Sequence, residues 1–170
     1  MKGISLFILL FLLLPCFAQD ESADDGKIKF VGSTHLIGSY YHLGSYSKER
    51  PLGFIEQSFE IVASPNYWFG IGTGFNLYPG TAVVPIYVSS RYVKDFNPKW
   101  GMHILQSYGR NIKMGNLGFN SNRLYGDIGA RYSFKELLGI NFGMGYLFNW
   151  DRWGGMSLSF TGSVGIYYGL

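Results

Sequence analysis

Residues 122–134, NRLYGDIGARYSF, decide the fold because their side chains sort into two sets when they are taken alternately. The set that begins at Asn122 holds no charge, whereas the set that begins at Arg123 also holds Asp127 and Arg131. Successive side chains of a strand point to opposite faces, so this stretch predicts a strand with one apolar and one charged face. The apolar face would point inward in a soluble sandwich and toward lipid in a transmembrane barrel.

The chain begins with a predicted secretory signal at residues 1–18. Lys2 precedes an apolar run at 4–14, and Ala18 supplies a small residue at the cut. The run is shorter than the roughly 20 residues of a spanning helix, which argues against a membrane anchor. Cys16 suggests a lipid-anchored lipoprotein as an alternative, but Pro15 stands where such a signal usually has a small residue. Because Cys16 is the only cysteine in the sequence, the mature chain would carry no disulfide. Residues 19–27 predict a short, acidic, disordered lead-in.

Composition bounds the class of protein. Lys2 is the only charge in the signal, so its removal lowers the net charge of +3 by one, and the remaining cations are not clustered. That balance argues against a nucleic-acid partner. The 24 glycines recur within alternating apolar segments, where they would weaken a helix. We therefore expect one domain, without helices after residue 27.

Alternation recurs in eight segments of the chain. The predicted strands are 27–45, 53–63, 69–78, 82–93, 100–110, 122–134, 140–150 and 156–170. Most are about 10 to 13 residues long, whereas soluble strands are nearer five or six and tilted membrane strands need roughly 9 to 11. An even number of strands leaves both termini on one side, and pairing of the first strand with the last closes the sheet into a barrel without an exposed edge strand. The prediction is an all-β, eight-stranded, antiparallel, up-and-down transmembrane β-barrel at residues 28–170.

Aromatic residues mark both ends of the predicted strands. Amphipathic rings prefer the two membrane interfaces, so we expect two aromatic belts. One belt would contain Trp68, Tyr92, Trp100 and Tyr132, and the other Tyr40, Tyr78, Trp150 and Trp153.

In its signal, strand count and last strand, the chain resembles the small eight-stranded outer-membrane β-barrel families of Gram-negative bacteria. In those families a terminal aromatic residue, with apolar residues at every second position before it, is read by the barrel-assembly machinery. Val164, Ile166, Tyr168 and Leu170 occupy that pattern here. Leu170 stands where those families usually have Phe. The resemblance implies a bacterial outer-membrane location, with outer-membrane lipid and the assembly machinery as partners.

Five charged residues lie on the strand faces opposite the apolar series: Glu56, Glu60, Arg91, Asp127 and Arg131. An Arg on the lipid face near the midplane would cost about 2–4 kcal/mol, so we place these charges in the lumen. An eight-stranded barrel is just wide enough to be filled by side chains, and the charges should pair across it. We expect Glu60, Arg91 and Arg131 to share one level, with Glu56 and Asp127 as a second layer of acids. The alternative is a proton or ion pathway.

No pattern of catalytic, metal or cofactor residues emerges. His35, His42 and His103 match no zinc or hydrolase spacing, so they are read as surface or lumen residues. Outer-membrane lipid A deacylases resemble this chain in fold, but their His-x-Ser spacing is absent, because Ser45 lies one residue too far from His42. The glycines at 70–74 are read as strand positions and not as a phosphate loop.

The first reading of function is therefore non-enzymatic: a plugged barrel with a structural or surface-interaction role. A surface partner would bind the outward loops, predicted at 45–52, 78–81, 111–121 and 151–155. The alternatives are an outer-membrane enzyme that acts on lipid or peptide at the rim, a small channel, and a soluble lipocalin-like barrel. The strand lengths and the missing Gly-x-Trp start argue against the lipocalin-like barrel.

Overall fold

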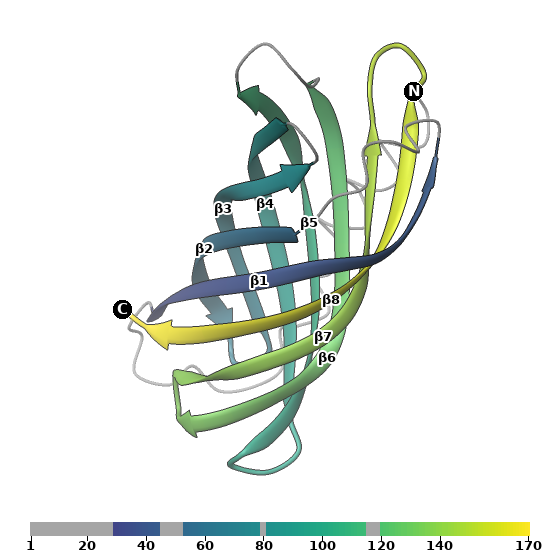
Figure 1. Ribbon diagram of the computed structural model, residues 1–170. Coiled ribbons are helices and arrows are strands. Elements are labelled where there is room, and N and C mark those ends of the chain that lie inside the picture. The colour runs from purple at the N-terminus through teal and green to yellow at the C-terminus, as the bar shows by residue number, and fades with distance from the viewer. Residues whose placement is uncertain (1–28, 45–52, 79–80, 115–119) are drawn as a thin grey trace.

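The computed structural model describes residues 29–44, 53–78, 81–114 and 120–170, which form eight long strands (Figure 1). The strands are β1 (Lys29–Gly44), β2 (Gly53–Ser64), β3 (Tyr67–Tyr78), β4 (Thr81–Asp95), β5 (Trp100–Met114), β6 (Ser121–Lys135), β7 (Leu138–Trp150) and β8 (Met156–Gly169). The predicted all-β fold is confirmed. The predicted signal at 1–18, the lead-in at 19–27 and the loop at 45–52 lie outside the described residues.

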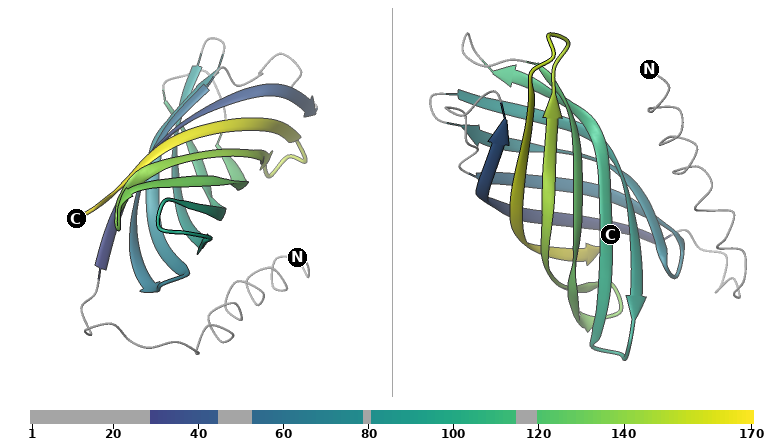
Figure 2. Two further views of the ribbon diagram at one scale, coloured as in Figure 1. Left: turned by 90° about the horizontal axis from the view of Figure 1, so that it is seen from below. Right: turned by 90° about the vertical axis from the view of Figure 1, so that its right-hand side faces the viewer.

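The strands close into one antiparallel barrel in sequence order. Each strand pairs with its neighbours, and β1 pairs with β8 from Val31↔Gly169 to Gly44↔Ser157. Figures 1 and 2 show how steeply the strands tilt, so that those of one wall cross those of the opposite wall. We call the end where β1 begins and β8 ends the terminal end. Connections of two, four and two residues, at 65–66, 96–99 and 136–137, join the strands there.

The predicted loop at 111–121 is wrong at both of its ends. β5 continues to Met114 and β6 starts at Ser121. Asn111 is buried inside the barrel, where its amide nitrogen donates to Ser121 Oγ at 3.0 Å and to Asn149 Oδ1 at 2.9 Å. A polar residue in a strand looks like a loop residue in the sequence, but a polar interior accepts it.

The two faces of each strand differ as a transmembrane barrel requires. Large apolar side chains are exposed on the outside, including Ile71 at 65% and Met144 at 68%, whereas Arg91 and Arg123 inside are 1% and 0% exposed. This reverses the arrangement of a soluble sandwich. Small inward residues make room for bulky ones, since a side chain at Gly72 would collide with the ring of Tyr87. In the part of the chain that the structure describes, no helix is long and apolar enough to cross a membrane.

Candidate functional site: the charged interior of the barrel

All five charges predicted for the lumen are buried inside the barrel. Their exposed fractions lie between 1% and 5%, for Glu56, Glu60, Arg91, Asp127 and Arg131. β2, β4 and β6 contribute them, on the face that alternates with the exposed apolar residues. Alternation therefore determines that they face inward. Which residue each one contacts depends on how the strands are staggered.

The first contact joins Arg91 of β4 to Glu60 of β2. Arg91 Nη2 donates to Glu60 Oε1 at 3.1 Å, and the two side chains are each 1% exposed. The same nitrogen lies 3.1 Å from His35 Nε2, which accepts because a guanidinium can only donate. Ser58 Oγ donates to Glu60 Oε1 at 3.2 Å. Arg91 is thus held between an acid of β2 and a histidine of β1.

The second contact joins Glu56 to Arg123, a residue absent from the predicted charge network. Arg123 Nη1 and Nη2 donate to the two carboxylate oxygens of Glu56 at 2.6 and 3.2 Å, which is a bidentate pair. The guanidinium lies over the ring of Tyr87, with its carbon 4.8 Å from the ring centroid. Arg123 shares the inward face of β6 with Asp127 and Arg131, and that alternation could have identified it.

Asp127 forms the third cluster, and here the predicted pairing is wrong. The sequence predicts that this carboxylate lies within reach of Arg131 and Arg91. Instead His103 Nε2 lies 2.7 Å from Asp127 Oδ1, and the hydroxyls of Tyr125 and Ser163 donate to Oδ2 at 2.9 and 2.6 Å. His103 and Asp127 are both almost fully buried. His35 and His103 therefore contact the interior charges, whereas the sequence analysis identified them only as surface or lumen residues.

Arg131 lies over the same Trp68 ring as Arg91, with the two guanidinium carbons 5.0 and 5.7 Å from the ring centroid, but its hydrogen bonds go to other residues than Glu60. Its Nε donates to the hydroxyl of Tyr167 at 2.9 Å, and its Nη2 donates to the backbone oxygen of Glu136 at 3.3 Å. Asp95 lies 3.9 Å away and is half-exposed. The guanidinium also lies over the rings of Tyr167 and Trp68, at 4.4 and 5.0 Å. Arg131 thus sits against aromatic rings at the terminal end.

Charge is balanced within this interior. Among the described residues, three carboxylates (Glu56, Glu60, Asp127) and three guanidinium groups (Arg91, Arg123, Arg131) are buried.

Two apolar clusters also lie inside the barrel. One contains Val31, Trp68, Val93 and Tyr167, toward the terminal end. The other contains Ile37, Phe54, Leu105, Tyr125 and Leu147. The described His, Asp and Glu side chains form no group of three that could hold a metal ion.

The aromatic belts need one correction. Trp68 is 2% exposed and lies inside the barrel, because it shares a face with the inward glycines of β3. Its neighbour Tyr67 takes the outward position and packs on Tyr92, with ring centroids 5.1 Å apart. Trp100 and Tyr132 pack at 4.8 Å at the same end.

At the other end, Trp150 packs on Tyr108 at 6.1 Å. Tyr40 is 58% exposed, Trp153 is 80% exposed in the β7–β8 turn, and Tyr78 is partly buried at the end of β3.

The last strand places its alternate residues on opposite faces. Val164 and Ile166 are exposed outside, whereas Tyr167 is fully buried inside. Tyr168 lies outside against Gly32, and its hydroxyl accepts a 2.9 Å hydrogen bond from Gln57 Nε2. Leu170 is exposed, and its backbone nitrogen donates to Phe30 O at 2.9 Å. That the barrel-assembly machinery recognises these alternating residues of the last strand stays a prediction.

His42 has a serine partner, though not the one considered in the sequence. The β1–β8 register shifts between Ser39 and Tyr41, which turns His42 inward, and its Nδ1 lies 2.8 Å from Ser159 Oγ. Ser159 is completely buried, so a substrate has no approach to its hydroxyl. The geometry of this pair is that of an interior contact. Ser45 lies outside the described residues.

No protein-family model and no curated protein sequence matches the chain. Solved structures do match its fold. A designed transmembrane β-barrel aligns with TM-score 0.52 and 13% identity over 88% of this chain and all of its own. The N-terminal β-barrel domain of Pseudomonas aeruginosa OprF aligns with TM-score 0.54 and 10% identity, over 82% of this chain and 97% of that one. The outer membrane protein OprG of the same organism aligns with TM-score 0.50 and 8% identity, over 84% and 95%. The chain therefore has the fold of the small eight-stranded outer-membrane barrels.

Proposed function

We propose that the protein is a non-enzymatic barrel of the bacterial outer membrane whose lumen is plugged by its own side chains. Its role would be structural, or surface interaction through the loops of the end opposite the termini. The observation that carries this proposal is the paired interior. Each of the three buried acids among the described residues contacts a buried base: Glu60 with Arg91, Glu56 with Arg123, and Asp127 with His103.

An open ion path requires a continuous water-filled space in the lumen, where the charges that line it would be exposed. The interior charges instead contact one another, form hydrogen bonds with tyrosine hydroxyls and lie over aromatic rings. A buried ion pair is stable only with good geometry and additional hydrogen bonds, and the bidentate Glu56–Arg123 pair has both charges almost fully buried. This favours a plug over a channel.

The outer surface supports the membrane location. Exposed large apolar residues occur on all eight strands, among them Phe30, Ile55, Ile71, Ile86, Ile112, Ile128, Phe142 and Ile166. Such a band would aggregate in water and is stable against hydrocarbon. One of the solved structures with this fold is an outer membrane protein, and another is a designed transmembrane barrel. The expected partner is thus membrane lipid, with the assembly machinery acting during biogenesis.

Membrane fractionation combined with heat-dependent gel mobility tests this proposal. We expect the mature chain in the outer-membrane fraction, with a folded form that migrates differently from the boiled form. A soluble periplasmic chain whose mobility does not change on boiling would overturn the membrane location and favour the lipocalin-like alternative.

A further inference from the structure

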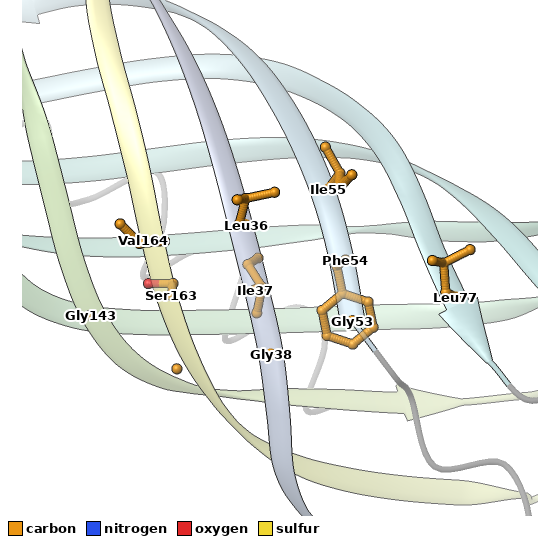
Figure 3. A pocket seen from close by; sticks show the side chains of 11 residues that line it. Leu36, Ile37, Gly38, Gly53, Phe54, Ile55, Leu77, Gly143, Ser163 and Val164 are labelled. Atoms are coloured by element: carbon orange, nitrogen blue, oxygen red, sulfur yellow. The ribbon is translucent and has the colours of Figure 1, made fainter.

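His35 of β1 is a buried histidine of the interior, and its two ring nitrogens have different surroundings. Figure 3 shows the two residues that follow it on β1, of which Leu36 is exposed outside and Ile37 is buried. His35 is 5% exposed and shares the inward face with Ile37. Its Nδ1 lies against Gly165 of β8, its register partner, where an added Cβ would meet that nitrogen at 2.6 Å. The other nitrogen, Nε2, faces Arg91 of β4 across the lumen.

A single nitrogen of Arg91 joins His35 to Glu60. Arg91 Nη2 lies 3.1 Å from Glu60 Oε1 and 3.1 Å from His35 Nε2. This nitrogen carries two hydrogens, so one is donated to the carboxylate and the other to the imidazole. Because a guanidinium cannot accept, Nε2 must offer a lone pair, and the proton of the ring lies on Nδ1. The contact therefore requires the neutral imidazole.

A proton on His35 Nε2 would break this contact. The nitrogen would then be a donor that faces another donor, and the ring would be a cation beside the guanidinium. Like charges repel strongly where water is excluded, and both side chains are almost fully buried. Glu60 is the carboxylate that Arg91 contacts, and one carboxylate cannot neutralise two cations. The interior that holds Arg91 therefore disfavours a protonated His35.

The other interior carboxylates already have partners. Glu56 of β2, the register partner of His35, accepts two hydrogen bonds from Arg123 of β6. Asp127 of β6 accepts from His103 of β5 and from the two hydroxyls described above. His103 and Asp127 are also close enough to His35 to act on it electrostatically, with opposite signs. Each buried carboxylate among the described residues is thus paired with a base, so a charge on His35 would have no counter-ion of its own.

We propose that His35 is an acid-sensitive lock of the barrel: its neutral ring holds the Arg91 guanidinium in place, and protonation of Nε2 releases it and destabilises the fold. An unfolded chain protonates a histidine near about pH 6.5, whereas the folded contact requires the neutral ring. The unfolded state therefore binds more protons in acid, and the stability that His35 contributes is lost as the pH falls below that value. The lock rests on the paired interior of the proposed function, which a measurement of ion conductance tests separately.

His103 provides a matched control, because it is a buried histidine with the opposite hydrogen-bond role. Its Nε2 donates to Asp127 Oδ1 at 2.7 Å, since a carboxylate only accepts. The N–H that makes this bond is present in both the neutral and the protonated ring. Protonation of His103 therefore preserves its contact, whereas protonation of His35 breaks its own.

Urea unfolding at two pH values tests the lock. The mature parent, His35→Gln and His103→Gln are folded into phosphatidylcholine vesicles and unfolded at about pH 8 and about pH 5, on either side of the ordinary histidine titration. In His35→Gln the amide oxygen can still accept from Arg91, but the side chain cannot take a proton. Over this interval, we expect the unfolding constant to rise about 30-fold more in the parent than in His35→Gln. His103→Gln should show at least the parental rise.

The outcomes of this experiment are distinct. Equal pH responses of the parent and His35→Gln would overturn the lock. A response lost equally in both variants would also overturn it, since the response would then not be specific to the contact with Arg91. Neither result would bear on the plug, because the absence of ion conductance does not depend on which group takes up the proton.

Nitrogen NMR of the folded, histidine-labelled parent provides a second test. At about pH 5, where a free histidine is almost fully protonated, we expect the His35 ring to remain neutral with its proton on Nδ1. Its signals are assigned by their loss in His35→Gln, or by elimination with His42→Gln and His103→Gln if that variant does not fold. A His35 ring that is protonated at this pH in the folded barrel would overturn the lock.

Discussion

Arg123 of β6 reaches across the inside of the barrel and donates two hydrogen bonds to the carboxylate of Glu56 on β2, at 2.6 and 3.2 Å. Both side chains are almost fully buried. A buried charge that loses its partner is costly, typically by about 3–5 kcal/mol. The pair therefore stabilises the fold only while both members are present.

Removing one member of this pair should destabilise the barrel strongly. We expect Arg123→Ala to lower the free energy of unfolding by about 3–5 kcal/mol, because Glu56 is left charged and buried. Urea unfolding in lipid vesicles measures this. The control Arg152→Ala removes an exposed arginine of the β7–β8 turn and should change little. The double variant Glu56→Leu/Arg123→Leu should lose less than Arg123→Ala, and equal losses in all three variants would contradict the pairing.

Tyr167 should matter through its hydroxyl. It accepts a hydrogen bond from Arg131 Nε at 2.9 Å and shares another with Ser133 Oγ at 2.6 Å. Tyr167→Phe keeps the ring under the guanidinium and removes both bonds, so we expect a loss of about 1–3 kcal/mol in urea unfolding. Arg131→Ala should cost more, since it removes the charge from Tyr167, Trp68 and Asp95 together. A Tyr167→Phe variant as stable as its parent would contradict this role.

Gly72 and Gly38 should respond differently to the same substitution, with a loss of stability at Gly72 and no change at Gly38. A Cβ at Gly72 would collide with the ring of Tyr87, which lies under Arg123, whereas a Cβ at Gly38 meets nothing within 4 Å. Overpacking of this kind typically costs about 1–3 kcal/mol, so Gly72→Ala should be destabilised by that amount. Gly38→Ala should retain the parental midpoint in urea. Equal stability of the two variants would show that the interior adapts freely.

The faces of the last strand can be tested with labels, because the mature chain would contain no native cysteine. We expect a fluorophore on Val164→Cys to be quenched strongly by a lipid-phase quencher, since Val164 is exposed outside. A fluorophore on Ser163→Cys should be quenched weakly, because Ser163 donates to Asp127 inside. Similar quenching at both positions would mean that the register is slipped by one residue.

Alternation was sufficient to predict the strands and most of the inward and outward residues. The same alternation also implies two inward positions that the prediction did not include, those of Trp68 and Arg123. Trp68 has the same parity as Gly70 and Gly72, and Arg123 has the same parity as Asp127 and Arg131, so their inward positions follow from the sequence. Trp68 was misplaced because a tryptophan near a strand end is typical of a belt.

The contacts across the lumen could not be predicted. Counting residues from strand ends does not show which charges meet, because the strands of a barrel are tilted and their register is staggered. Arg131 therefore contacts Tyr167, and Asp127 contacts His103. The irregularity between Ser39 and Tyr41 similarly reverses the face of His42, and no sequence signal fixes its position.

Electrical recording in a planar bilayer tests the plugged lumen most directly. With the wild-type barrel, and with the turn variant Arg152→Ala, we expect no steady ion conductance, because the interior charges are paired and packed among side chains. A porin added to the same bilayer serves as the positive control. Stable current steps from the wild-type protein would contradict the plug and favour a channel.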